Sequence, residues 1–222
     1  MKNICLIPAR GGSKRLPRKN IKMFCGKPLI TWSIEIAIKS KLFEKIYVST
    51  DDMVIANIAK KNGAEIPFIR PKELADDFTN DKQVRDHFLS WTKSKQLTFD
   101  YLCYLYPTAP FITVETLKGC LDLLIKSNAS QSLTITNFDY PVQRALKNNE
   151  EGFLDFKWEK YKNSRSQDLE ELFHDAGQCY FFNLKKNENG EKVGYRLPRY
   201  LCQDIDTEED FIMAEKLFKI KQ

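Results

Sequence analysis

A short basic loop is the first part of the chain whose residue types suggest chemistry. It follows an apolar run and reads Arg10-Gly11-Gly12-Ser13-Lys14-Arg15-Leu16-Pro17-Arg18-Lys19-Asn20. Two adjacent glycines let backbone N–H groups approach an anion closely, with a positive φ where one is needed. The arginines and lysines could donate charge-assisted hydrogen bonds to phosphate oxygens. The pattern favours a phosphate-binding loop, and the alternative is a solvated basic turn.

Two pairs of carboxylates could act together with this loop. Asp204 and Asp206 are separated by one residue in an expected strand end, so both side chains should point the same way. Oxygen ligands at that spacing suit Mg²⁺, which also bridges to phosphates. The alternative is that Asp206 or Thr207 caps the final helix. Asp51 and Asp52 also follow an expected strand, and they could either support the site or cap the next helix.

Several other kinds of site are not supported. The loop contains neither G-x-x-x-x-G-K-[ST] nor G-x-G-x-x-G, which argues against a P-loop NTPase and a Rossmann dinucleotide site. The six cysteines are scattered without a C-x-x-C pair, so we expect reduced and mostly buried thiols. With only His87 and His174 as imidazole ligands, a zinc site is not expected.

The elements that must position these residues alternate between strand-like and helix-like patterns. We expect strands at 4–7, 45–49, 65–69, 101–106, 132–136 and 178–182, and helices at 29–38, 53–61, 81–94, 114–126 and 208–219. This alternation predicts an α/β fold with three layers and a mainly parallel sheet. Ligands should then bind at the carboxyl ends of the strands, near the loops after Ile7, Ser49, Tyr106 and Thr136.

The alternation breaks between about residues 137 and 173. This stretch is richer in Asn, Glu and Lys and contains a turn signal at 148–152. We interpret it as a hairpin-like excursion inserted into one domain that covers residues 1–222.

Composition narrows the class further. A chain of 222 residues with 42% apolar residues and a net charge of +5 is ordinary for a globular protein. No apolar run approaches the ~18 residues of a membrane span, and the N-terminal run is too short for a signal peptide, so we expect a cytoplasmic protein without a membrane partner. The positive charge is concentrated in one loop, which suits a small polyanion better than a nucleic acid.

The ordered motifs of the chain resemble those of the acylneuraminate cytidylyltransferases, the enzymes that make CMP-sialic acids. The opening loop carries the main signature, and the resemblance continues along nearly the whole chain through Gly26-Lys27-Pro28-Leu29-Ile30, Ser49-Thr50-Asp51-Asp52, Arg70-Pro71, Pro107-Thr108-Ala109-Pro110, Arg165-x-Gln167-Asp168-Leu169 and Asp204-Ile205-Asp206-Thr207. It implies a Rossmann-like nucleotidyltransferase fold. It also implies attack by the anomeric hydroxyl of an acidic nine-carbon sugar on the α-phosphorus of CTP, with loss of pyrophosphate.

The resemblance also implies roles for single residues. Arg10, Lys19 and Asp206 are the expected catalytic residues, and Asp204 and Asp206 the expected ligands of Mg²⁺, for which Mn²⁺ could substitute. A bound metal could lower the pKa of the attacking hydroxyl, so a separate protein base is not required. The expected nucleotide contacts are Ala9, Arg10, Gly11, Gly12, Ser13, Lys19, Asn20, Arg70 and Thr79. For Arg70 the alternative is an ordinary surface charge.

The expected sugar contacts are Tyr106, Arg165, His174 and Gln178. Tyr106 stands where sialic acid enzymes usually have Gln, and the stretch around His174 resembles the pseudaminic acid branch. An aromatic residue at position 106 is consistent with a less hydroxylated sugar. N-acetylneuraminate and legionaminate remain alternative substrates, and a nucleic-acid-binding module is the alternative of a different class. His174 could also be structural. The family forms homodimers through an excursion like 137–173, so we expect the same here.

Overall fold

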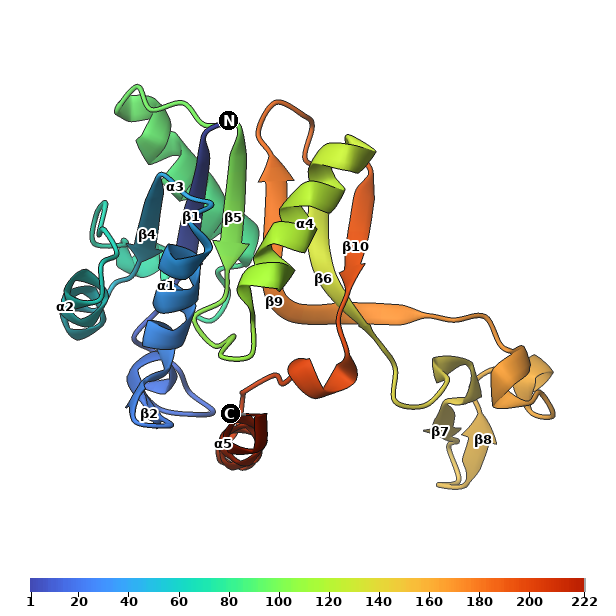
Figure 1. The fold of residues 1–222 in the computed structure, drawn as a ribbon. Helices are drawn as coiled ribbons and strands as arrows, with labels where there is room; N and C mark the ends of the chain where they lie inside the picture. The colour runs from blue at the N-terminus through green and yellow to red at the C-terminus, as the bar shows by residue number, and fades with distance from the viewer. Residues whose placement is uncertain (222) are drawn as a thin grey trace.

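The computed structural model describes residues 1–221 and has a six-stranded sheet at its centre (Figure 1). The strands are β1 (Asn3–Pro8), β4 (Lys45–Ser49), β5 (Tyr101–Leu105), β6 (Gln131–Asn137), β9 (Phe173–Asn183) and β10 (Lys192–Arg196), in the order β10-β6-β9-β5-β1-β4. Strand β9 is antiparallel to β5 and β6, and the other neighbours are parallel. The expected mainly parallel sheet is confirmed.

Helices cover both faces of this sheet, which is why β1 is apolar on both sides. Helices α1 (Leu29–Ser40), α2 (Met53–Lys61) and α4 (Val114–Ser127) pack on one face, where Ile34, Ile55 and Leu121 share a core with β1 and β4. Helix α3 (Asp81–Ser94) packs on the opposite face through Phe88. These are the three expected layers.

The last helix, α5 (Glu208–Lys221), lies below the carboxyl ends of the parallel strands (Figure 1). Its Phe211 and Phe218 pack edge-on against Phe24, in the small antiparallel pair β2 (Met23–Phe24) and β3 (Lys27–Pro28). The end of the chain is thereby brought back to the segment that follows the basic loop.

Two expected elements differ from the structure. The stretch 65–69 makes only two isolated parallel bridges, Tyr47 to Glu65 and Thr50 to Ile69, because Pro67 between them has no N–H to donate. The edge strand β10 was not expected. Strand β9 is also longer than the expected 178–182, since its first half runs outward from the core (Figure 1).

That first half of β9 leads to an arm formed by residues 137–173, which projects away from the body (Figure 1). The arm contains a short antiparallel hairpin of β7 (Leu146–Asn148) and β8 (Leu154–Phe156). Its apolar side chains are largely uncovered: Leu146, Phe153 and Leu154 are 53%, 67% and 66% exposed.

All six cysteines are free thiols, and four of them are buried. Among residues 1–221, no helix combines the length and apolar character that crossing a bilayer requires.

Candidate active site

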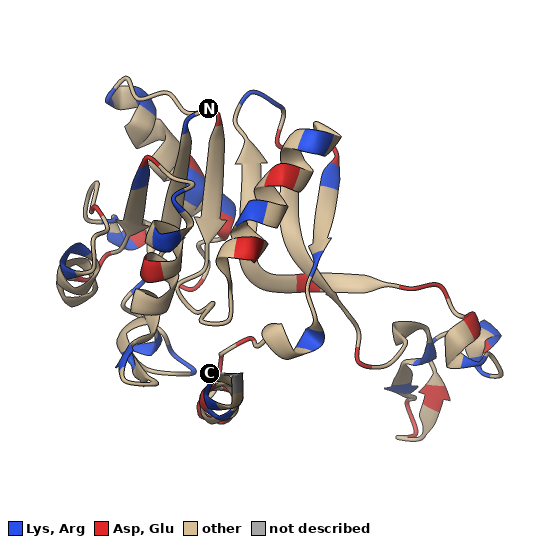
Figure 2. Cartoon of the chain, in the orientation of Figure 1, with Lys and Arg blue, Asp and Glu red and all other residues tan. Residues whose placement is uncertain are grey.

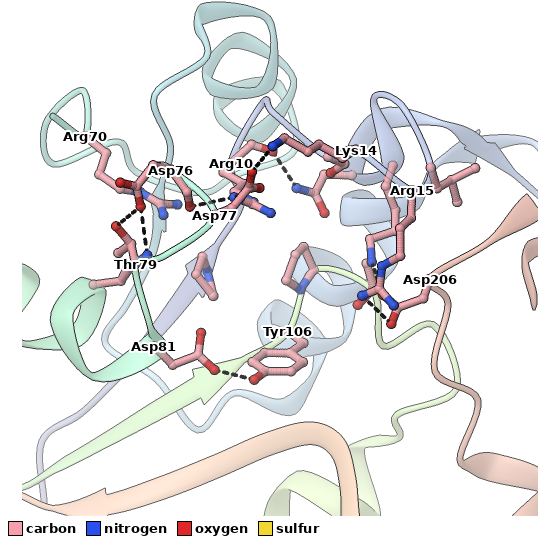
Figure 3. Close-up of a pocket in the computed structure, with 18 of the residues that line it drawn as sticks. Arg10, Lys14, Arg15, Arg70, Asp76, Asp77, Thr79, Asp81, Tyr106 and Asp206 are labelled. Atoms are coloured by element: carbon pink, nitrogen blue, oxygen red, sulfur yellow. Dashed lines mark hydrogen bonds and ion pairs between the residues drawn. The ribbon is translucent and has the colours of Figure 1, made fainter. Parts of the chain in front are cut away.

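A cavity of about 410 Å³ opens at the carboxyl ends of β1 and β5 (Figure 3). The basic loop, the segment 70–81, the end of β5 and the segment before α5 all contribute to its walls. It brings together side chains that are up to about 200 residues apart in sequence. Most of the predicted nucleotide residues line it, namely Arg10, Ser13, Lys19, Asn20, Arg70 and Thr79.

Acidic side chains hold the cations of the basic loop within the cavity. One amino group of Arg10 donates to the carbonyl of Asp76 at 2.6 Å and lies 3.0 Å from the carboxylate of Asp77. Lys14 pairs with the same carboxylate (Figure 3). Asp77 therefore sits beside the groups that would receive phosphate oxygens.

The start of the loop is fixed by two carboxylates that follow β4. The Gly11 N–H donates to Asp51 Oδ1 at 2.9 Å, so this amide already has a hydrogen-bond acceptor within the protein. A Cβ on Gly11 would lie 2.9 Å from Asp52, which explains the glycine by close packing, and neither Gly11 nor Gly12 has a positive φ. Asp52 caps α2 by accepting from the N–H groups of Val54 and Ile55. The capping role weighed for Asp52 is confirmed.

Lys19 and Asp206 join the basic loop to the segment before α5. The Lys19 Nζ donates to Asp206 Oδ1 at 2.9 Å and to the Ile205 carbonyl at 2.7 Å. Arg15 lies 2.7 Å from the other oxygen of Asp206 (Figure 3). A phosphate bound here would meet two cations that are positioned by one carboxylate.

The predicted strand around Asp204 and Asp206 is wrong, because residues 202–206 form an irregular segment after a short 3-10 helix. Ile205 is nevertheless fully buried, and both carboxylates line the cavity. Thr207 and Asp210 cap α5 through reciprocal hydrogen bonds. The Asp206 carboxylate does not take part in this cap and pairs with Lys19 and Arg15 instead. Crowding by protein atoms and the charge of Asp206 raise the pKa of Asp204.

Arg70 is buried rather than a surface charge, with only 5% of it exposed. It donates to the Ser49 carbonyl at 2.5 Å and to the Leu74 carbonyl at 3.3 Å, and its burial lowers its pKa. Asn20, also 5% exposed, donates to the Arg10 carbonyl at 2.9 Å. Both residues therefore line the cavity and also hold its walls.

Thr79 and Tyr106 form another side of the cavity (Figure 3). The Thr79 hydroxyl donates to Asp76 Oδ1 at 2.7 Å and closes a turn just before α3. Tyr106 follows β5 and donates its hydroxyl hydrogen to Asp81.

Six predicted site residues do not line the cavity, and two of them, Gly11 and Gly12, lie in the basic loop beside it. Ala9 lies in the core, and its N–H donates to the Ser49 carbonyl. Gln178 is 2% exposed and donates to the Leu201 carbonyl, so it braces β9 against the segment leading to Asp204. His174 is exposed beside Phe138, and Arg165 pairs with Asp168 on the arm. None of these six residues lines the cavity that one chain forms.

Other residues of the site were not found from the sequence. Asp76, Asp77, Asp81 and Tyr104 all line the cavity. The segment 73–81 carries four carboxylates in nine residues, which was the only available signal.

The fold and the cavity place cationic side chains at the ends of the parallel strands, as expected of an α/β enzyme that binds a polyanionic nucleotide. A family model described as cytidylyltransferase matches residues 4–208, and the chain belongs to this family.

The chain is similar to proteins with related names. It is 41% identical to a pseudaminic acid cytidylyltransferase of Campylobacter jejuni, over 99% of this chain and 97% of that protein. It is 31% identical to a CMP-N,N'-diacetyllegionaminic acid synthase of Legionella pneumophila, over 100% and 98% of the two chains. A solved CMP:2-keto-3-deoxy-manno-octonic acid synthetase complexed with CTP has a TM-score of 0.72 over both whole chains. At 14% identity, this last likeness shows the fold alone.

Proposed function

We propose that the enzyme transfers CMP from CTP to the anomeric hydroxyl of pseudaminic acid and releases pyrophosphate. The observation that carries the proposal is the 41% identity to a pseudaminic acid cytidylyltransferase over nearly the whole of both chains. The identity to the legionaminic acid synthase is ten points lower, from 41% to 31%. The aromatic Tyr106 at the cavity wall also supports a sugar with fewer hydroxyl groups.

The basic loop would hold the triphosphate. Negative charge grows on phosphate oxygens as the α-phosphorus is attacked and pyrophosphate leaves. Fixed cations stabilise such charge without having to reorganise during the reaction. Lys19, with its two hydrogen bonds to the segment before α5, is the best-positioned cation, and Arg10 and Arg15 flank it in the cavity. Binding of CTP would exchange their present carboxylate partners for phosphate oxygens.

Asp204 and Asp206 would hold Mg²⁺, or Mn²⁺ in its place. Burial and, to a smaller extent, the charge of Asp206 raise the pKa of Asp204, and a divalent cation between the two carboxylates would relieve their repulsion. One or two protein carboxylates are usual for Mg²⁺ that shares phosphate and water ligands. When bound, the ion supplies charge neutralisation at phosphate and a lower pKa for a bound hydroxyl. The chain's part is to hold both carboxylates in the cavity through the buried Ile205.

A nucleic-acid-binding module is not supported by the charge distribution. Lys and Arg residues are interspersed with Asp and Glu along the ribbon (Figure 2). The loop cations also lie in a recessed cavity and pair with carboxylates.

Release of pyrophosphate from CTP and Mg²⁺ with a panel of purified sugars tests the proposed substrate. Pseudaminic acid should be turned over with the highest kcat/KM, ahead of N,N'-diacetyllegionaminic acid and N-acetylneuraminate. Equal or better turnover of N-acetylneuraminate would refute pseudaminic acid as the preferred substrate and would leave the enzyme class unchanged.

We also propose that the enzyme is a homodimer joined through the arms formed by residues 137–173. The exposed Leu146, Phe153 and Leu154 support this proposal, because such apolar surface is usually covered by a partner. Arg165 would then complete the sugar site of the partner subunit, since it lies on the arm and outside the cavity of its own chain (Figure 1).

Mixing two inactive variants tests this arrangement. An Arg165→Ala chain and an Asp206→Asn chain would form mixed dimers in which one of the two sites carries both native residues. Random exchange should restore about a quarter of the wild-type activity. No recovery despite proven exchange, or a fully active monomer, would show that Arg165 does not act across an interface.

A further inference from the structure

Asp81 is a cavity carboxylate that the chemistry described above does not use. It is the first residue of α3, and an Asn80–Gln83 capping box fixes the start of that helix. Its Oδ1 accepts from the Tyr104 hydroxyl at 2.9 Å, and its Oδ2 accepts from the Tyr106 hydroxyl. One rigid helix end thus holds two tyrosines that belong to β5 and its extension.

The partners of Asp81 distinguish it from other carboxylates of the cavity. Asp77 and Asp206 pair with loop cations, whereas both oxygens of Asp81 are taken by tyrosine hydroxyls. A negative charge in a site for two anionic substrates is unfavourable unless it has another use. The burial of Tyr104 and Tyr106 and the nearby charge of Asp81 raise the pKa values of both tyrosines, so both hydroxyls stay protonated and continue to donate.

Tyr106 is the wall between two cavities. Tyr104, Tyr106 and Asp81 line both the 410 Å³ cavity and a second one of about 370 Å³ on the α3 side of the sheet. On that side the ring of Tyr106 lies 5.5 Å from that of Tyr180, whose hydroxyl donates to Asp175 at 2.8 Å. The ring is therefore held at its hydroxyl by Asp81 and at its face by a second fixed tyrosine.

We propose that Asp81 is a positioning residue for the sugar, acting by holding Tyr106 as an aromatic wall of the sugar-binding half of the cavity. The inference rests on the proposed function. With its proton committed to Asp81, Tyr106 presents to the cavity a ring and an oxygen that can only accept a hydrogen bond. Such a surface suits a nonulosonic acid with methyl and acetamido groups, since it offers an apolar contact and an acceptor for an amide N–H.

Three variants test the proposal: Asp81→Asn, Tyr106→Phe and the double variant. Asn removes the charge and keeps only one acceptor oxygen for the two tyrosine hydroxyls, so the hold on Tyr106 is weakened, and Phe removes the same hydrogen bond from the other side. Each single variant should raise the KM for pseudaminic acid by about tenfold, the lower end of the effect expected for losing a hydrogen bond to a charged group. The KM for CTP should change less than twofold. The double variant should be no worse than Asp81→Asn, because both changes remove one interaction.

Asp86→Asn is the matched control. Asp86 lies on the same helix and pairs with Lys82 at 2.7 Å on the surface, so its loss should leave both KM values unchanged. Additive effects in the double variant would overturn the proposal. So would a higher KM for CTP in Asp81→Asn alone, since Asp81 would then act on the nucleotide.

If Asp81→Asn does not fold, Tyr106→Phe decides alone, and a wild-type sugar KM in that variant overturns the proposal. Wild-type enzyme without turnover of any nonulosonic acid would overturn the proposed function and this inference together. Active wild-type enzyme with unchanged variants would overturn the inference only.

Discussion

Replacing Lys19 by Met should impair both catalysis and stability, by different amounts. The Lys19 Nζ makes two hydrogen bonds to the segment before α5, one of them to the carbonyl of the fully buried Ile205. Leaving a buried carbonyl without a donor costs about 1–3 kcal/mol. For a chain of this size, that lowers Tm by roughly 2–12 °C.

The catalytic effect should be much larger than this loss of stability implies. Removing one preorganised group that stabilises transition-state charge lowers kcat by roughly 10²–10³-fold. Steady-state pyrophosphate release, measured well below the Tm of the variant, gives kcat separately from the folded fraction. Lys19→Arg keeps the charge and should recover most of the Tm but only part of kcat, because a planar guanidinium does not match the ammonium position. A Lys19→Met enzyme with lowered Tm and a kcat within threefold of wild type would refute the reasoning, since Lys19 would then be a structural tie only.

Three further predictions follow from other contacts. Arg70→Met should lower the free energy of unfolding by about 2–4 kcal/mol and Tm by roughly 5–15 °C, because two backbone carbonyls lose their donor. Calorimetry checks this, and an unchanged Tm would contradict it. Asp77→Asn should lower the Kd for pyrophosphate severalfold in titration calorimetry, with Asp86→Asn unchanged, whereas weaker binding would mean that Asp77 organises the loop. Asp52→Ala should cost about 1 kcal/mol through loss of the α2 cap. Burial raises the pKa of Asp52, but the hydrogen bonds from Arg18 and from backbone N–H groups lower it more, so the net pKa is lowered. The Tm difference between Asp52→Ala and wild type should therefore be complete above about pH 4 and vanish as the pH falls through the lowered pKa. A Tm difference that persists at lower pH would contradict this.

The helices were predictable where the sequence carries their capping residues. The bounds of α2 and α3 match the expected ones because Asp52 and the Asn80–Gln83 pair mark their starts. The strand β10 was missed because it is a five-residue edge strand that pairs only with β6 and has Gly194 at its centre. Local sequence carries little signal for such an element, since its stability comes from its neighbour.

The part of the cavity formed by the basic loop was largely predictable, because its residues are contiguous in sequence. The partners that hold this loop were not, since Asp77 and Asp206 meet Arg10 and Lys19 only after the chain has folded. Asp204 and Asp206 were predicted to share a side for the wrong reason. Burial of Ile205, rather than strand geometry, places both carboxylates in the cavity.

The predicted sugar contacts were the least predictable part of the site. Tyr106 lies at the cavity wall, while His174, Gln178 and Arg165 lie elsewhere in a single chain. Similarity between motifs indicates which residues matter, but it does not say whether they act directly, as a buried brace, or from a second subunit.

We propose that the loop cations, together with Asp204 and Asp206, form one site that joins CMP to pseudaminic acid. Phosphorus NMR of a mixture of enzyme, CTP, Mg²⁺ and pseudaminic acid tests it most directly, with Asp206→Asn and the surface control Glu208→Gln run in parallel. Wild type and Glu208→Gln, whose side chain is 59% exposed, should give equal amounts of a CMP-sugar phosphodiester and pyrophosphate, and Asp206→Asn should give almost none. Unchanged CTP in the wild-type mixture, or wild-type yield from Asp206→Asn at saturating Mg²⁺, would contradict it.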